Sequence, residues 1–199
     1  MANVSDLVAP LQLMCRMVGP AQAQLALVEA MKKFMIDTGI FNDHAQMEYQ
    51  AGVPEYIIDI PMSRIIVSVV NVSVNGVPTT QWARDGIYNN IWLFEEYDDR
   101  SCIDVEYTWA INGVDDCEIP DEFLSRFQMP ILDGARMYLH RMYGSQMIDP
   151  TVAMLAQREF ENAIADTKAR RIMNFSNSRP VLRSGKMRRR SRASARRFL

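Results

Sequence analysis

Two pairs of adjacent carboxylates are the residues of this sequence that come nearest to acid and base chemistry. Asp98-Asp99 and Asp115-Asp116 each place two carboxyl groups side by side, so that one can hold a proton while the other accepts one. Both pairs fall in segments predicted to be turns, where aspartate is common because its side chain bonds to the nearby backbone. We therefore interpret both pairs as solvated turn residues.

A serine next to a cysteine, Ser101-Cys102, is the closest approach to a nucleophile. A nucleophile needs a base within hydrogen-bond reach, and the chain has only two histidines, His44 and His140. His140 stands beside Arg141 in a predicted helix, where we expect it at the surface. The sequence therefore predicts no catalytic residue and no cofactor-binding residue, and we expect that the protein is not an enzyme.

Ligands for a metal ion are also few. The two histidines and three cysteines form neither a His-x-x-x-His nor a Cys-x-x-Cys pair, so no zinc site is expected, while a carboxylate-only site for Mg²⁺ or Ca²⁺ stays open. Three widely spaced cysteines suit a reducing compartment. No apolar run approaches the roughly 18 residues that span a bilayer, so we expect no membrane partner and no signal peptide.

The basic residues gather toward the end of the sequence. From Thr167 onward there are 12 basic residues and no acidic one, whereas the other 10 basic residues accompany all 24 acidic ones, which leaves the body with a formal charge of about −14. Such asymmetry predicts an interaction arm aimed at an anionic partner. We assign the arm to residues 176–199, with these binding residues: Arg179, Arg183, Lys186, Arg188, Arg189, Arg190, Arg192, Arg196, Arg197, Phe198 and Leu199.

Two kinds of partner fit this arm. Its guanidinium groups can neutralise the phosphates of a nucleic acid, without sequence preference and with strong salt dependence. They can equally pair with carboxylates on a protein, with Phe198 and Leu199 as apolar anchors. The composition of the arm leaves both alternatives open.

Helix signals flank the middle of the chain. A helix is expected from Pro20 to a cap at Gly39, with one apolar face, and a shorter one over 5–17. A second long helix should begin at Pro120 and be kinked or split at Met129 by Pro130, while Gly134 permits close approach of another helix. Asp149-Pro150 should cap a last helix that runs to about residue 175. The apolar faces expected for these helices are Leu25, Val28, Met31 and Met35; Phe123, Phe127, Ile131, Ala135, Tyr138 and Met142; and Val152, Ala156, Phe160, Ile164 and Thr167.

Period-two patterns predict five or six strands between the first and second long helices. The clearest are 55–60, 65–74, 91–94 and 102–109, joined by short turns and therefore antiparallel. Asn75-Gly76 supplies the positive-φ pair of a two-residue type I′ hairpin. In the strand before it, Ile66, Val70, Val72 and Val74 should share a buried face.

These elements predict an α+β fold with four parts. Residues 1–43 and 112–175 form the body, a bundle of three to four helices; residues 44–111 are an inserted antiparallel β-rich region; and residues 176–199 are the extended basic arm.

The order of these parts resembles the head-to-tail adaptor, or neck, proteins of tailed bacteriophages. The matching stretches span residues 19–170: GPAQAQLALVEAMKKFMIDTGIF, EYIIDIPMSRIIVSVVNVSVNGVP, CEIPDEFLSRFQMPILDGARMYLHRMYG and DPTVAMLAQREFENAIADTKAR. Adaptors of this kind have an early helix, a phrase like Y-x-I-D-x-P followed by I-x-V-x-x-V-x-V-N-G, then I-P-D-E-F and a last helix that opens with Asp-Pro. The high arginine density of the arm departs from the family pattern.

The resemblance implies a structural protein of the virion neck, assembled in the host cytoplasm. It implies a homo-oligomeric ring of about a dozen copies beneath the portal protein, with the arm docked on the portal and a tail or nozzle protein below. DNA would pass through the channel of the ring, whose acidic wall would let it slide. The hairpin at Asn75 and Gly76 is expected to contact the tail or a neighbouring copy. The alternative is a nucleic-acid-binding accessory protein that uses the arm on DNA.

Overall fold

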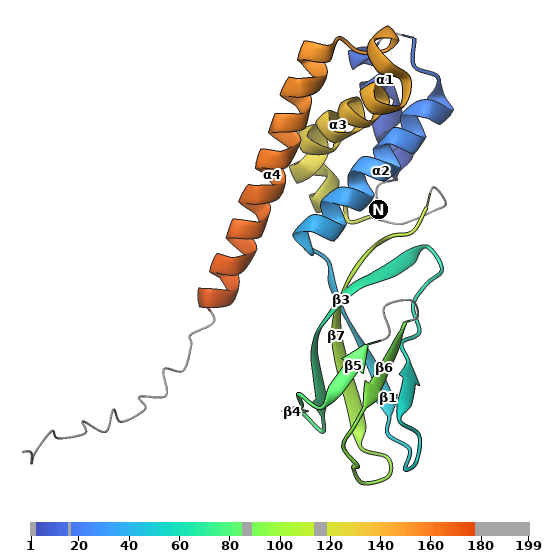
Figure 1. The fold of residues 1–199 in the computed structure, drawn as a ribbon, viewed down its shortest axis with the longest axis vertical. Coiled ribbons are helices and arrows are strands. Elements are labelled where there is room, and N and C mark those ends of the chain that lie inside the picture. Colours follow the sequence, from blue (N-terminus) through green and yellow to red (C-terminus); the bar gives the residue numbers. More distant parts are fainter. Residues whose placement is uncertain (1–2, 16, 85–88, 114–118, 178–199) are drawn as a thin grey trace, which may run out of the picture.

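Helices gather at one end of the molecule and antiparallel strands at the other (Figure 1). The structure, a computed structural model, describes residues 3–15, 17–84, 89–113 and 119–177, with side chains as far as residue 171. The helical elements are η1 (Val4–Leu7), α1 (Val8–Met14), α2 (Pro20–Thr38), α3 (Asp121–Tyr143), η2 (Gly144–Gln146) and α4 (Pro150–Asn177). The strands are β1 (Asn42–Glu48), β2 (Glu55–Ile57), β3 (Arg64–Val74), β4 (Val77–Pro78), β5 (Trp82–Arg84), β6 (Asn90–Leu93) and β7 (Cys102–Ile111). The predicted mixture of helices with antiparallel sheets is confirmed.

Helix α2 begins and ends at the predicted signals. Pro20 occupies its first turn, and the Gly19 N–H donates to Gln22 Oε1 at 3.0 Å, which caps the start. The helix ends at Gly39, whose φ of 55° is the left-handed conformation that glycine adopts without strain. The predicted buried face was wrong at Leu25, which is 40% exposed, because Ala26 and Leu27 turn toward the core instead.

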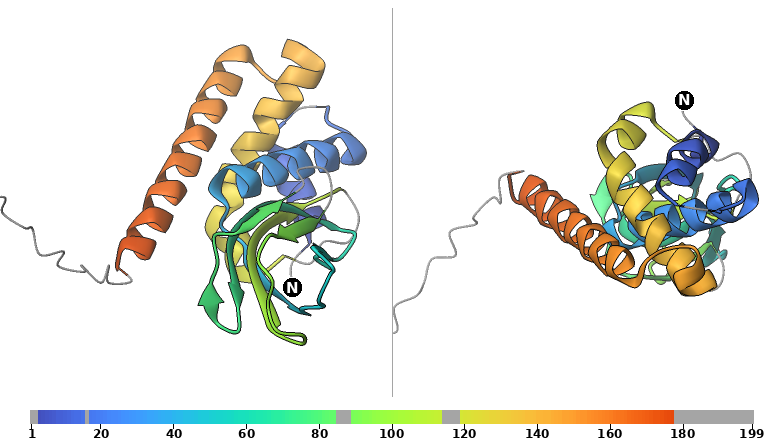
Figure 2. Two further views of the ribbon diagram at one scale, coloured as in Figure 1. Left: turned by 60° about the horizontal axis from the view of Figure 1, so that its bottom comes forward. Right: turned by 90° about the horizontal axis from the view of Figure 1, so that it is seen from above.

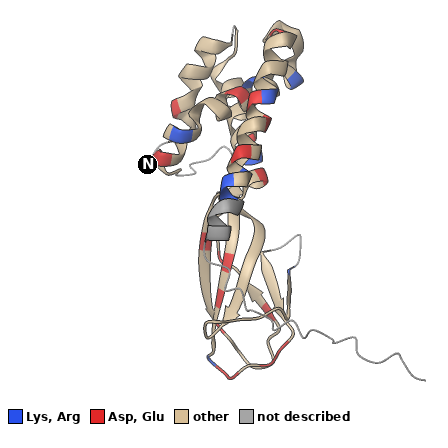
Figure 3. Ribbon diagram, turned by 90° about the vertical axis from the view of Figure 1, so that its left-hand side faces the viewer, with Lys and Arg blue, Asp and Glu red and all other residues tan. Residues whose placement is uncertain are grey.

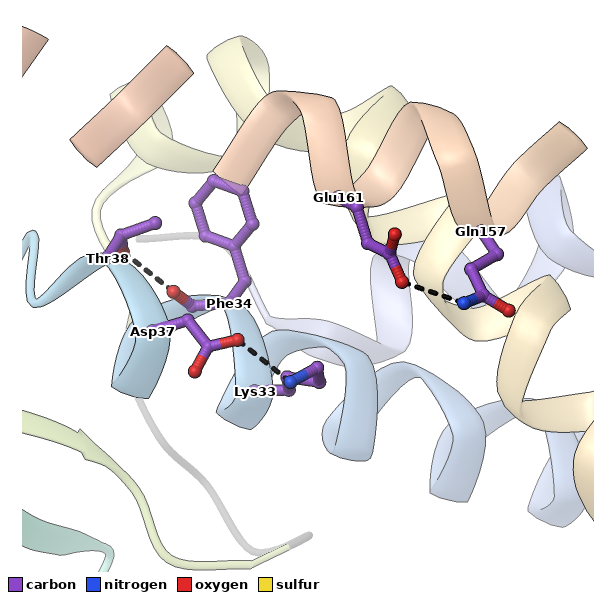
Figure 4. Close-up of polar contacts among 6 residues, drawn as sticks. All are labelled: Lys33, Phe34, Asp37, Thr38, Gln157 and Glu161. Carbon is purple, nitrogen blue, oxygen red and sulfur yellow. Dashed lines mark hydrogen bonds and ion pairs between the residues drawn. The ribbon is translucent and has the colours of Figure 1, made fainter. Parts of the chain in front are cut away.

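An aromatic cluster joins the three long helices. The ring of Phe34 on α2 lies 4.9 Å from that of Phe127 and 6.0 Å from that of Phe123 on α3, and 6.1 Å from that of Phe160 on α4, all between ring centroids. Figure 4 shows Phe34 rising from α2 toward α4, with the Thr38 hydroxyl donating to the Phe34 carbonyl at 2.7 Å. These edge-on and tilted ring contacts stabilise the helical end beyond the area that they bury.

Gly134 is the point of closest approach between the helices. A Cβ atom at this position would lie 2.7 Å from the Phe160 ring and 2.9 Å from Ala30 Cβ, both shorter than real Cβ contacts. The prediction that Gly134 admits another helix is confirmed, and it admits two, because α2 and α4 both pack here. The missing side chain therefore sets the spacing of all three helices.

Helix α3 continues through Pro130, so the predicted split at Met129 was wrong, whereas the alternative, a kink, stays a prediction. Proline inside a helix removes a hydrogen bond and costs about 3 kcal/mol. The core compensates, because Phe127 before Pro130 and Ile131 after it are both buried on the same face. Further along, Met142 in the last turn of α3 is 41% exposed, so its predicted place on the apolar face was wrong.

Helix α4 starts at the cap predicted for it. The Asp149 carboxylate Oδ1 accepts the N–H of Thr151 at 2.8 Å and of Val152 at 3.4 Å, and these bonds hold the pKa of Asp149 below its ordinary value. The predicted apolar side of α4 is confirmed at Ala156, Phe160, Ile164 and Thr167, which are all buried.

The strands form two antiparallel sheets in the orders β1-β7-β3-β4 and β2-β6-β5. The described residues hold seven strands, more than the five or six predicted, because β4 and β5 are only two and three residues long. Two register shifts interrupt the pairing of β3 with β7, between Ile66 and Ser68 and between Val69 and Asn71. Each bulge inserts into β3 one residue that has no partner on β7. Val70 is the residue inserted at the second shift and is 39% exposed, so its predicted place on the buried face was wrong.

Arg84 ties the smaller sheet to the bulged part of the larger one. Its guanidinium donates to the carbonyl oxygens of Val67 at 2.9 Å and Ile66 at 2.8 Å. These carbonyls lie at the first register shift of β3, where the ladder is locally interrupted. The two sheets are thus joined by hydrogen bonds from one side chain to the backbone of β3.

Replacing Gly134 with alanine tests the spacing of the helices. Alanine favours an isolated helix by about 1 kcal/mol over glycine, but overpacking should lower the free energy of unfolding by about 2 kcal/mol. Urea denaturation measures this. Gln128→Ala, on the exposed side of α3, is the matched control and should not destabilise. The loss should shrink in a Phe160→Leu background; a Gly134→Ala variant more stable than the wild type would contradict the packing.

Asp149→Ala tests the cap of α4. Because the folded-state pKa of Asp149 is depressed, the stabilisation is complete above the unfolded-state pKa of ~3.9 and is lost as the pH falls through the lower folded-state value. We expect a lower melting temperature for Asp149→Ala at pH 7 and a closing gap below about pH 3.9. Asp149→Asn, which keeps the capping oxygen, should stay near the wild type. The same difference in melting temperature between wild type and Asp149→Ala at neutral and at strongly acidic pH would argue against the cap.

Candidate functional site

The predicted arm follows α4 and lies almost entirely outside the described residues. Of its assigned binding residues, from Arg179 to Leu199, none is described. The end of α4 that leads to them is described, and it projects beyond the other helices (Figure 2). Lys168 and Arg170 are exposed near this end, after the last acidic residue, Asp166.

The hairpin at Asn75 and Gly76 has the predicted type I′ geometry. Its two central residues have φ values of 51° and 77°, and Val74 pairs with Val77. Asn75 is also tied to the start of β7: its N–H donates to the Cys102 carbonyl at 2.8 Å, and its Oδ1 accepts the Cys102 N–H at 2.8 Å. Val77 is 68% exposed. The contact of this hairpin with the tail or with another copy stays a prediction.

The hairpin belongs to a larger surface at the end of the β part farthest from the helices. We call it the β tip; it comprises residues 49–54, 75–78 and 94–101, which hydrogen bonds join to one another, including Ala51 N–H to Asp99 Oδ1 at 2.9 Å and Arg100 N–H to the Tyr49 carbonyl at 3.0 Å. Exposed apolar and acidic side chains share this surface: Val53, Val77, Phe94, Glu95, Glu96, Asp98 and Asp99. Figure 3 shows acidic residues along the strands and the distal loops.

A groove of about 250 Å³ opens on the β tip. It is lined by Tyr49, Gly52, Val53, Pro54, Leu93, Phe94, Glu95 and Glu96. Glu95 is held in place, because Tyr97 Oη donates to its Oε2 at 2.5 Å and Thr79 Oγ1 donates to the same oxygen at 3.3 Å. Burial and the bond to Glu95 raise the pKa of Tyr97. An apolar wall beside carboxylates suits contact with a protein surface.

The residues with possible nucleophilic chemistry do not come together. Ser101 is buried and its Oγ accepts Asn75 Nδ2 at 3.0 Å. His44 pairs with Glu106 across β1 and β7, four residues along the strand from Cys102, or roughly 13 Å. His140 is half-buried, with Nδ1 3.2 Å from the Ile148 carbonyl, so its expected surface position was wrong. Asp98 closes a turn to Ser101, as predicted, whereas Asp115-Asp116 and Cys117 lie outside the described residues.

Among the described residues, no three His, Cys, Asp or Glu side chains are grouped so that they could hold a metal ion. No helix in the described part of the chain is both long and apolar enough to cross a bilayer.

Two surfaces escaped prediction from the sequence. Phe94 was assigned to a strand, yet it is 64% exposed just after β6. The adjacent Glu95-Glu96 was the available signal, because two charges in succession seldom follow a buried aromatic residue. The second surface gathers three arginines from two helices, and no pattern along the sequence marks it.

Comparison with known proteins gives no match, whether to protein-family models or to curated proteins.

Asn75 links the hairpin to the rest of the β tip, so its replacement tests that surface. Asn75→Ala removes two side-chain hydrogen bonds and places alanine at a positive φ that asparagine tolerates better, which should lower the free energy of unfolding by about 2 to 3 kcal/mol. Asn75→Gly removes only the bonds and should lose less. Val77→Thr, at an exposed position of the same hairpin, is the control. If chemical denaturation gave Asn75→Ala the same free energy of unfolding as the wild type, the role of Asn75 in joining the hairpin to the β tip would be contradicted.

Proposed function

We propose that the protein is a head-to-tail adaptor of a tailed bacteriophage. It is a structural protein, with no catalysis, that forms a ring of about a dozen copies beneath the portal protein and links the portal to the tail. Its site of action is the neck of the virion. In this proposal the helices are the bundle of the adaptor body, residues 44–111 are the inserted β region, and residues 176–199 are the arm that fastens each copy to the portal.

The observation that carries the proposal is the direction in which α4 leads the chain. Its C-terminal end leaves the body (Figure 2), and residues 178–199, which follow it, contain nine basic residues and no acidic one. A strongly cationic segment that continues from a projecting helix is suited to fastening on an anionic partner. These 22 residues can reach roughly 70 Å at 3.3 Å per residue, farther than the radius of the body.

The charge of the remaining body favours the same proposal. Outside the basic stretch that starts at Thr167, the chain carries a formal charge of about −14. Repeated around a ring, this charge would surround a channel with negative potential, and DNA would pass without adhering. A protein whose whole surface bound DNA would need a net positive charge on its body instead.

The β tip supplies a second face for assembly. It lies at the far end of the β part from the helices and combines exposed apolar side chains with fixed backbone geometry at Asn75 and Gly76. A rigid, partly apolar surface of this kind suits contact with the tail or with a neighbouring copy. The arm and the β tip together give the two attachments that an adaptor requires.

Deleting residues 178–199 tests the fastening role directly. The truncated chain should stay folded, with a melting temperature within about 2 °C of the full chain, because the described core lies before residue 178. It should fail to attach to purified portal-bearing capsids in a co-sedimentation assay. Attachment at full occupancy without the arm would contradict the proposal.

A matched control separates the adaptor from the nucleic-acid-binding alternative. Replacing the eight arginines of residues 178–199 with lysine keeps the charge and length but loses the bidentate fork that carboxylates prefer. Portal attachment should then weaken about tenfold or more, while retardation of duplex DNA at low salt should change little. If the unmodified full chain retards DNA but does not attach to the portal at all, the result would favour the alternative.

A further inference from the structure

A pocket of about 280 Å³ lies where α3, α4 and the start of β1 meet. Three of the described residues that line it are arginines, Arg126, Arg170 and Arg171, and none is acidic; the others are Ile40, Asn42, Phe127 and Thr167. We call it the arginine pocket. Arg170 and Arg171 belong to the basic stretch that starts at Thr167, and with Arg126 they gather beside a body whose other residues carry a formal charge of about −14. The pocket is therefore a concentrated positive site on an otherwise acidic surface.

The three arginines are held to different extents. Arg171 is anchored, because Nη1 donates to the Thr38 carbonyl at 3.0 Å and Nη2 approaches Asn42 Oδ1 at 3.5 Å. The guanidinium of Arg126 lies 5.3 Å from the centroid of the Phe127 ring. Arg126 and Arg170 are exposed, and neither pairs with a carboxylate within the described part of the chain. The guanidinium groups of Arg126 and Arg170 are thus available to a ligand, in a pocket where Arg171 is fixed in position.

The walls of the pocket select among anions. Ile40 and the Phe127 ring contribute apolar surface to the pocket beside the guanidinium groups. A nucleic-acid phosphate would satisfy the arginines but would leave that apolar surface without a partner. A carboxylate that stands next to an apolar side chain would satisfy both. The ligand that fits is therefore an acidic peptide segment with an aromatic or aliphatic neighbour.

The β tip presents such a segment. Phe94 is 64% exposed and is followed directly by Glu95 and Glu96, with Asp98 and Asp99 after them. The loop is fixed by its bonds to residues 49–51, so little ordering is needed on binding. An exposed aromatic ring beside several carboxylates is complementary to the arginine pocket in both charge and polarity.

The segment cannot enter the pocket of its own chain. Asn42, in the pocket, pairs with Thr108, whereas the loop ends just before Cys102, which pairs with Glu48. Six residues of antiparallel strand separate the two sites by roughly 20 Å. The contact must be made between two copies, and because its two halves are different surfaces, it is a head-to-tail contact that can repeat.

We propose that the arginine pocket of one copy receives the Phe94–Asp99 segment of a neighbouring copy. Phe94 packs against the apolar side formed by Phe127 and Ile40, and the carboxylates of Glu95 and Glu96 face Arg126 and Arg170. The inference rests on the proposed function, because it names the contact by which copies of the adaptor join into a ring.

Charge reversal on each side of the contact tests it in the full-length chain. Arg126→Glu with Arg170→Glu, and separately Glu95→Lys with Glu96→Lys, should each weaken self-association at least about tenfold in sedimentation velocity at low salt. A mixture of the two variants should associate again, because opposite charges then meet at every contact. Arg141→Glu with Arg158→Glu, on exposed positions away from the pocket, is the matched control and should associate like the wild type.

Three results would overturn the proposed contact. The first is a wild-type chain that stays monomeric up to about 1 mM. The second is a mixture of the reversed variants that associates no better than either alone. The third is loss of DNA retardation, rather than of association, in Arg126→Glu with Arg170→Glu, which would assign the pocket to phosphate. Capsid attachment by the arm is measured separately, so the contact can fail while the adaptor proposal stands, and the reverse also holds.

Discussion

The absence of a side chain at Gly134 is the constraint on which the helical end of the molecule depends. Because the Phe160 ring and Ala30 occupy the space that a Cβ atom would need, α2, α3 and α4 meet at one point. Phe34 then contacts aromatic rings on both other helices. This contact also fixes the direction of α4, since Phe160 lies between the cap of this helix at Asp149 and its projecting end. The direction in which the chain leaves the body is therefore a consequence of core packing.

The same packing positions the surface features that suggest a function. Arg171, near the end of α4, reaches back to the Thr38 carbonyl at the end of α2, and its guanidinium occupies the space beside Gly39 where a Cβ would lie. From Gly39 the chain passes directly into β1, which pairs along its length with β7 and so extends the β part away from the helices. The arginine pocket and the β tip consequently lie at opposite ends of one antiparallel ladder. Two complementary surfaces held apart by a stiff strand pair favour contact between copies over contact within one copy.

Local signals in the sequence were sufficient for much of this fold, and tertiary packing explains where they failed. Pro20, Gly39, Asn75-Gly76 and Asp149 act through backbone geometry within a few residues, so their roles could be predicted. The effects of Pro130 and Val70 could not be predicted, because burial on both sides of Pro130 offsets its cost and Val70 is the unpaired residue of a bulge in β3. The arginine pocket is built from three segments, 40–42, 126–127 and 167–171, that lie far apart in sequence, and no local pattern marks it. The arm was visible from composition alone, and its assigned residues beyond 177 lie outside the described residues.

The location and copy number of the protein in purified virions test the adaptor proposal most directly. Cryo-electron microscopy without imposed icosahedral symmetry, combined with quantification of protein copies per particle, would give both. The proposal predicts a single ring at the portal vertex, with about a dozen copies per particle and the arms directed toward the portal. Copies distributed over the capsid shell, or associated with the packaged DNA instead of the neck, would contradict it.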